Sequence, residues 1–236
     1  MRLIFVRHGE PDYKNDCLTP NGVEQAKCTA ERLRNEPIAA VYSSPLGRAR
    51  ETASYTAGVH GLDVNILDFM REINWGTIRK DENDDRKELE FGGHPWTLSY
   101  QLLTEHPEYI GNYEWDKHEL FSNNICTGYY DIISKEFDKF LLNFGLERRD
   151  GLYCCNEVCN DTIVLFAHGG SGAIMFSHVL NIPLPYVFCG MPYAVCSVSS
   201  IVFDAHEGKK VIPRLELFND VGHIPNLKTE RLKFDK

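Results

Sequence analysis

Residues 2–10 read RLIFVRHGE, and this stretch decides which fold class the chain can adopt. A compact run of apolar, β-favouring side chains that ends in charge and glycine is typical of a short buried strand. The segment TIVLFAHGG at residues 162–170 repeats the arrangement. In an open α/β sheet, ligands bind beyond the carboxyl ends of the parallel strands. We therefore expect His8 and His168, which follow these two strands, to lie at the same edge of one sheet.

Strand and helix signals alternate along the first 70 residues. A capping residue followed by proline predicts a helix start at Thr19-Pro20 and again at Ser44-Pro45. Further short strands are expected over residues 39–42 and 63–67. This alternation predicts a three-layer α/β/α fold with a mainly parallel central sheet.

The middle and the end of the chain follow other patterns. Residues 76–130 combine dense charge and scattered aromatic side chains with GGHP at 92–95. We expect a helical or irregular lid there, inserted into a single domain that spans residues 1–236. Apolar residues at helical spacing predict a helix from Tyr130 to about residue 144. Residues 195–218 predict a β-hairpin at one edge of the sheet.

Composition excludes several classes of protein. The chain has 236 residues, 43% of them hydrophobic, and a net charge of −9. It can bury a core of its own, but it lacks the basic field of a nucleic-acid or anionic-membrane binder. No apolar run approaches the roughly 18 residues of a membrane span, and the first residues lack the apolar stretch of a secretory signal, so we expect a cytoplasmic protein. The eight cysteines contain no C-x-x-C pair, which favours reduced thiols over a metal site, with a redox-sensitive pair as the alternative.

Charged side chains at the predicted strand ends favour phosphate chemistry. Arg7 adjoins His8, and Arg48 falls near the first turn of a predicted helix, where backbone amides and a guanidinium both attract phosphate oxygens. Gly169 lets a ligand approach the backbone closely. Glu72 comes just after the third predicted strand. Each residue alone has an ordinary explanation as a structural histidine or an exposed charge, but their combination at one sheet edge favours a binding site.

Five motifs, in order along the chain, resemble those of the histidine phosphatase superfamily, which has the phosphoglycerate mutase-like fold. They are RHGE (7–10), LTPNGVEQA (18–26), SSPLGRARETA (43–53), REINWG (71–76) and AHGG (167–170). The resemblance implies that His8 is the nucleophile that accepts the phosphoryl group and that Glu72 is the general acid. It implies that Arg7, Arg48 and His168, with Gly169 beside them, bind the phosphate. It also implies a reaction without metal or cofactor.

Departures from the family pattern leave alternatives open. Lys14 stands where many relatives have asparagine, so Lys14 and the neighbouring Asn15 are both candidate phosphate ligands. The long ERxYGxLxG stretch of the cofactor-dependent phosphoglycerate mutases is absent, which favours hydrolysis of a small phosphate ester over a phosphomutase reaction. A non-catalytic module for phosphorylated ligands is less expected, because both histidines, both arginines and Glu72 are retained. A dinucleotide-binding site at residues 170–175 is excluded, because the G-x-G-x-x-G motif needs glycine where Met175 stands. Substrate identity and oligomeric state stay open.

Overall fold

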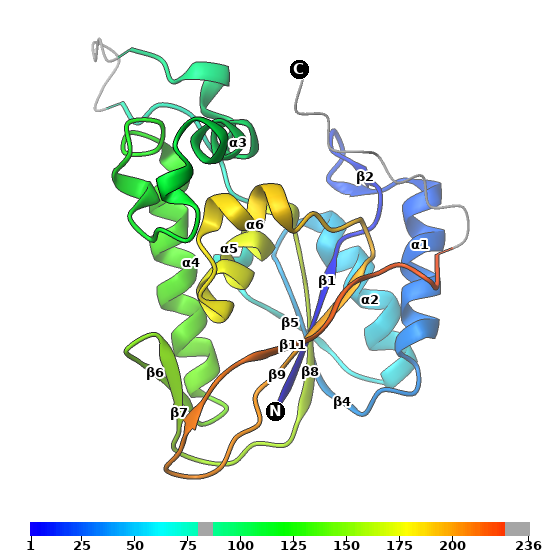
Figure 1. Ribbon diagram of the computed structural model, residues 1–236. Helices are drawn as coiled ribbons and strands as arrows, with labels where there is room; N and C mark the ends of the chain where they lie inside the picture. Colours follow the sequence, from blue (N-terminus) through cyan, green and yellow to red (C-terminus); the bar gives the residue numbers. More distant parts are fainter. Residues whose placement is uncertain (80–86, 225–236) are drawn as a thin grey trace. The chain divides into compact units, whose positions relative to one another are not determined.

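Six strands form the central sheet within residues 1–79 and 87–224, which the computed structural model describes (Figure 1). Their order across the sheet is β11 (Arg214–Asp220), β9 (Val198–Val202), β1 (Arg2–Arg7), β8 (Thr162–Ala167), β4 (Ile38–Ser43) and β5 (Val64–Ile66). β1, β8, β4 and β5 are mutually parallel, whereas β9 is antiparallel to both of its neighbours, β1 and β11. The predicted α/β fold with a mainly parallel sheet is confirmed.

Two helices cover one face of this sheet. They are α1 (Pro20–Leu33) and α2 (Gly47–His60), and Leu33 and Ala53 pack with Val164 in a single hydrophobic cluster. Thr19 caps α1 as predicted, because its hydroxyl accepts a hydrogen bond from the Gly22 amide at 3.0 Å. The prediction that Ser44 caps α2 is wrong. The N-cap is Leu46, and the Ser44 hydroxyl has a different partner, described below.

The carboxyl-terminal part of α4 (Ile125–Leu142) covers the opposite face of the sheet. Phe140 meets the Tyr42 ring of β4 edge to face, with 4.9 Å between ring centroids, and Phe137 packs on Phe69. α4 begins at Ile125, whereas we predicted a start at Tyr130, five residues later. α5 (Gly169–Leu180) follows directly from β8.

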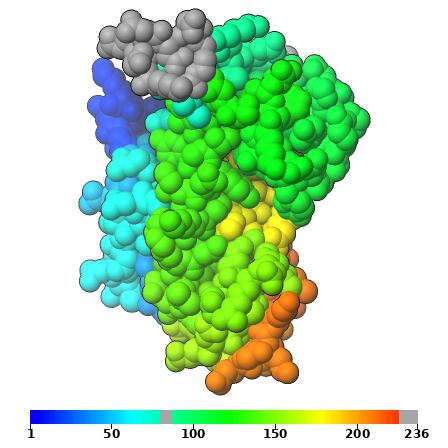
Figure 2. All heavy atoms as spheres, turned by 90° about the vertical axis from the view of Figure 1, so that its left-hand side faces the viewer, coloured from blue at the N-terminus to red at the C-terminus, as the bar shows by residue number. Residues whose placement is uncertain are grey.

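A smaller sheet and a short ribbon lie outside the central sheet. β6 (Leu146–Arg149) and β7 (Leu152–Cys155) form a hairpin, and β10 (Lys210–Val211) adds to β7. In Figure 2 the orange atoms near residue 210 lie beside the yellow-green atoms of this region. The predicted hairpin at 195–218 is therefore built from β9 and β11, with β10 in their connection. β2 (Pro11–Asp12) pairs with β3 (Cys17–Leu18) in the loop after β1.

Residues 73–135 and 173–192 form a second compact unit. It contains α3 (Pro95–Glu105) and α6 (Leu184–Gly190), together with the first part of α4 and most of α5. α3 and α6 pack through Trp96 and Phe188, with 4.5 Å between ring centroids. Short 3₁₀ turns occupy Glu90–Gly93, Pro107–Tyr109 and Trp115–Lys117, and another, Asp68–Met70, belongs to the first unit. The organisation as one domain with a lid over 76–130 stays a prediction. No helix among the described residues is both long and apolar enough to cross a membrane.

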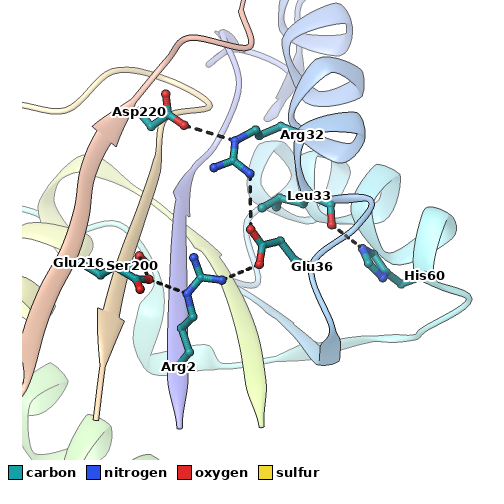
Figure 3. Close-up of polar contacts among 8 residues, drawn as sticks. All are labelled: Arg2, Arg32, Leu33, Glu36, His60, Ser200, Glu216 and Asp220. Carbon is teal, nitrogen blue, oxygen red and sulfur yellow. Dashed lines mark hydrogen bonds and ion pairs between the residues drawn. The ribbon is translucent and has the colours of Figure 1, made fainter. Parts of the chain in front are cut away.

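An ion-pair network ties the amino end of β1 to α1 and β11 (Figure 3). Arg2 pairs with Glu36 at 2.5 Å and with Glu216 at 2.7 Å. Arg32 pairs with Glu36 at 3.4 Å and with Asp220 at 3.3 Å. These partly exposed pairs each contribute little to stability. Because a strand rises about 3.3 Å per residue, Arg2 lies roughly 20 Å from His8, which follows the other end of β1.

Candidate active site

His8 continues β1 by one residue and is held by the backbone around it. Its amide donates to the Ala167 carbonyl at 2.9 Å, and the residue is only 1% exposed. The ring nitrogen Nδ1 lies 2.7 Å from the Gly9 carbonyl oxygen. A carbonyl can only accept, so we assign the proton to Nδ1, which leaves the lone pair on Nε2. That tautomer is the one a nucleophilic histidine needs.

His168 lies beside His8, with 5.0 Å between the two ring centroids. Its Nε2 is 2.7 Å from the Ser44 hydroxyl oxygen, which also accepts a bond from the Leu46 amide. In the tautomer in which the Ser44 hydroxyl donates to Nε2, Nδ1 of His168 carries the ring proton. This buried Nδ1 has no hydrogen-bond partner within the part of the chain that the structure describes.

Both histidines are neutral at physiological pH. Burial lowers the pKa of His8 to about 3, and the nearby charges of Arg7 and Arg48 act in the same direction. Burial likewise lowers the pKa of His168 to about 2, with His8 and the same two arginines adding to the shift. Desolvation of a cationic imidazole is the leading cause in each case.

Arg7 and Arg48 are anchored in the same way. Arg7 donates from Nη1 to the Tyr193 carbonyl at 2.8 Å, and Arg48 donates from Nη1 to the Asp16 carboxylate at 2.6 Å. The Nε atom of each arginine is buried without a hydrogen-bond partner among residues 1–79 and 87–224. Gly169 lies against the Arg7 guanidinium, since a Cβ built there would stand 3.6 Å from Cζ. Each arginine thus keeps its Nε edge for another acceptor.

Around His8, the buried Nε–H groups of Arg7 and Arg48 lack acceptors among the described residues, and so does Nδ1 of His168 in the tautomer that carries its proton there. A buried donor without a partner is costly, so native proteins rarely keep several together unless a ligand completes them. A tetrahedral oxyanion supplies several acceptor oxygens and the negative charge that two arginines favour. The arrangement can bind a phosphoryl group next to a neutral imidazole nitrogen.

Glu72 is placed over the first turn of α5. Its Oε1 accepts hydrogen bonds from the amides of Gly170 at 2.9 Å and Ser171 at 3.1 Å. These residues come directly after His168 and Gly169, so the carboxylate is brought to the same sheet edge as both histidines. The structure thus gathers all five principal predicted residues and Gly169 in one place.

The motif at residues 18–26 supports the loop that carries His8. Gln25 accepts from the Glu10 amide at 2.8 Å, and a Cβ at Gly22 would stand 2.2 Å from the Glu10 carbonyl oxygen. Thr52 of the third motif accepts from the Gly9 amide at 3.0 Å. These residues hold the loop after β1 in position without being part of the site themselves.

Sequence reasoning missed three residues that contact the site: Ser44, Asp16 and Tyr193. Ser44 stands in the third motif, but its cap-like position hid its role. Asp16 directly follows Lys14 and Asn15, the two residues that we considered as phosphate ligands. Tyr193, whose carbonyl binds Arg7, also donates from its hydroxyl to the Gly169 carbonyl at 2.6 Å. Tyr193 carries no sequence signal, because it reaches the site from 186 residues beyond Arg7.

Lys14 and Asn15 both lie on the exposed loop between β2 and β3. The Asn15 amide donates to the Asp12 carboxylate at 2.7 Å, and the Lys14 side chain is exposed. It is the next residue, Asp16, that contacts Arg48. A role for Lys14 or Asn15 as a phosphate ligand stays a prediction.

The burial of the two histidines predicts an acid-sensitive fold. Below pH 6.5 the unfolded chain binds protons at both histidines, whereas the folded chain binds them only near pH 3 or lower, so stability falls as pH drops. At pH 5 the loss relative to pH 7 is about 2 kcal/mol for each histidine. Urea unfolding at both pH values measures it. His8→Asn should remove about 2 kcal/mol of the stability loss between pH 7 and pH 5, and an unchanged loss in the variant would contradict the assignment.

Comparisons with known proteins show what this chain is similar to. Residues 3–107 match the model of the histidine phosphatase superfamily (branch 1), which confirms the predicted resemblance. The probable phosphoglycerate mutase GpmB of Photorhabdus laumondii is 30% identical over 89 residues, covering 34% of this chain and 41% of that protein. The probable phosphoglycerate mutase GpmB of Salmonella choleraesuis is 32% identical over 101 residues, covering 39% of this chain and 47% of that protein. The chain thus spans less than half the length of these curated relatives.

Solved structures resemble the chain over nearly its whole length. A phosphoserine phosphatase of Entamoeba histolytica, crystallised with 3-phosphoglyceric acid, has a TM-score of 0.58 at 24% identity and covers 94% of this chain and 98% of its own. The alpha-ribazole phosphatase of Shigella flexneri has a TM-score of 0.59 at 17% identity, with 93% and 96% covered. A mycobacterial glucosyl-3-phosphoglycerate phosphatase has a TM-score of 0.59 at 20% identity, with 92% and 98% covered. These likenesses establish the fold.

Proposed function

We propose, from the match of residues 3–107 to the histidine phosphatase superfamily and from the geometry of the site, that the protein is a phosphomonoesterase acting on a small phosphate ester. One observation carries the proposal. A buried, neutral His8, with its lone pair on Nε2, lies among buried N–H donors that lack acceptors among the described residues. A nucleophile and an oxyanion site in contact are the parts that phosphoryl transfer requires.

The reaction proceeds in two displacements. In the first, Nε2 of His8 attacks phosphorus, the bond from phosphorus to the ester oxygen breaks, and that oxygen takes a proton from Glu72. In the second, Glu72 removes a proton from water, the resulting oxygen attacks phosphorus, and the bond to Nε2 breaks to release phosphate. Arg7, Arg48 and His168 stabilise the charge on the equatorial oxygens in both steps. The phosphohistidine on His8 is thus the covalent intermediate.

Neither a metal nor a cofactor takes part in the proposed reaction. The guanidinium groups of Arg7 and Arg48 supply the positive charge that a metal ion would otherwise provide. A phosphomutase is the second candidate, because the curated relatives carry that name. It would return the phosphoryl group to the substrate instead of passing it to water.

A substrate panel tests the proposal. Purified protein is incubated with aryl, sugar, amino-acid and glycerate phosphates, and released inorganic phosphate is measured with and without EDTA. We expect hydrolysis of at least one ester, unchanged by the chelator. Isomerisation of a phosphoglycerate without phosphate release would favour the mutase. Activity lost with EDTA and restored by a divalent cation would overturn the metal-free mechanism.

A further inference from the structure

The carboxylate of Asp16 holds both the guanidinium of Arg48 and the start of the helix that carries it. Oδ1 accepts from Arg48 Nη1 at 2.6 Å, and Oδ2 accepts from the Gly47 amide at 2.7 Å. The Arg48 side chain is 9% exposed, whereas that of Asp16 is 42% exposed. The Tyr13 ring also lies 5.4 Å from the Arg48 Cζ atom. The guanidinium is therefore fixed from its solvent side by residues of the β2–β3 loop.

This contact decides which edge of the guanidinium is left for a ligand. Nη1 is occupied by Asp16, and the buried Nε has no acceptor among the residues that the structure describes. Arg7 has the same pattern, with the Tyr193 carbonyl in place of the carboxylate. A planar guanidinium binds two phosphate oxygens through one edge, so fixing Nη1 directs the Nε edge of each arginine to the anion.

The backbone around Asp16 is built for this contact. Asp16 has a φ of 49°, a left-handed conformation that few non-glycine residues adopt. A Cβ at Gly47 would stand 2.0 Å from the Asp16 carbonyl oxygen, so any side chain at that position would displace the loop.

The contact also has an electrostatic cost. Asp16 cancels the charge of one of the two arginines, which weakens the attraction of the site for a dianion. Partial burial alone would raise the pKa of Asp16, but the Gly47 amide and Arg48 hold it below its ordinary value, so the carboxylate stays charged. Because Asp16 weakens the attraction for the dianion, we expect its contribution to be the position of the Arg48 guanidinium rather than the charge of the site.

We infer that Asp16 is a positioning residue for phosphoryl transfer: it fixes Arg48 so that the Nε edge of the guanidinium meets the phosphate. This inference rests on the proposed function for its role in turnover, but not for its role in binding phosphate. Asp16→Ala should lower kcat/KM for p-nitrophenyl phosphate on the order of 10²-fold, mainly through kcat, because misplacing a transition-state contact by about 1 Å has that effect. Asp16→Asn should lose less, because the amide keeps one acceptor oxygen.

The control is Glu36→Gln, which alters another carboxylate bound to arginines, at the far end of β1 (Figure 3). It should leave kcat/KM within about twofold of the wild-type value, since exposed and partly exposed ion pairs contribute little. Equal losses in the two variants would assign the effect to general destabilisation and overturn the inference. No loss in Asp16→Ala would overturn it as well.

A double-mutant cycle separates positioning from any other role of Asp16. If Asp16 acts through Arg48, then adding Asp16→Ala to Arg48→Ala causes no further loss of kcat/KM or of affinity for inorganic phosphate. Losses that multiply would overturn the inference. Phosphate affinity is measured by the shift in thermal unfolding, so the cycle can be completed even where turnover is absent. If the protein hydrolyses no ester but the losses of phosphate affinity in the cycle are non-additive, the proposed function is rejected. The role of Asp16 in binding phosphate is then still supported.

Discussion

Replacing His8 with alanine is expected to abolish hydrolysis while binding of inorganic phosphate partly survives. The variant lacks the nitrogen that forms the bond to phosphorus, but it retains the donors of Arg7, Arg48 and His168. Loss of a nucleophile that acts together with the rest of a site lowers kcat by a factor on the order of 10⁴–10⁶. Steady-state rates and the phosphate-induced shift in thermal unfolding measure the two effects separately.

A trapping experiment with labelled substrate identifies the covalent intermediate. Wild-type protein quenched during turnover of labelled substrate should carry a phosphoryl group on His8 that is labile in acid and stable in alkali. His60→Ala is the control, because His60 lies at the end of α2 and contacts the Leu33 carbonyl at 3.1 Å, away from the site (Figure 3). It should trap as much label as the wild type. A label on another residue, or full activity in His8→Ala, would contradict the assignment of the nucleophile.

Replacing Glu72 with glutamine should slow the enzyme in a way that depends on the leaving group. The amide keeps an oxygen that can accept from Gly170 and Ser171, so the loop is preserved, but it cannot donate a proton to a poor leaving group. Alkyl phosphates should lose on the order of 10²–10⁴-fold in rate. p-Nitrophenyl phosphate should lose less in the first step, because nitrophenolate leaves without a proton.

Hydrolysis of the intermediate also loses its base in this variant. Phosphohistidine should therefore accumulate with p-nitrophenyl phosphate, and the release of nitrophenol should show a burst. Glu216→Gln, which alters a carboxylate bound to Arg2 at the far end of β1, serves as the control and should behave as the wild type. Equal losses on both ester types without a trapped intermediate would mean that Glu72 is not the acid.

The edge of the sheet at which the site lies could be predicted from the sequence, because it depends on local patterns. The apolar segments before His8 and His168 form β1 and β8, which are adjacent and parallel, with Arg7 opposite Ala167. Side chains that directly follow such strands must share an edge. The β6–β7 hairpin was missed because three of the four residues of β6 are charged, although Asp150-Gly151 between the strands, with φ values of 51° and 78°, carries a common turn signal.

Ser44 shows where local patterns mislead. A serine followed by proline is a helix-start signal, and the hydroxyl does accept a weak bond from the Leu46 amide at 3.3 Å. In the folded chain, however, His168 lies 2.7 Å from the same hydroxyl, 124 residues away in the sequence. The helix begins three residues later, at Gly47, where Asp16 binds its first amide.

The sequence by itself determined the fold class, the sheet edge and the types of residue gathered there, because strand patterns and the residues that follow them are local. Only the tertiary structure decided how those residues are held. Asp16 anchors Arg48 across 32 residues, and the Tyr193 carbonyl anchors Arg7 across 186. Such contacts form between segments that meet only after the sheet is assembled. They therefore depend on distances between folded elements, which residue spacing along the chain does not encode.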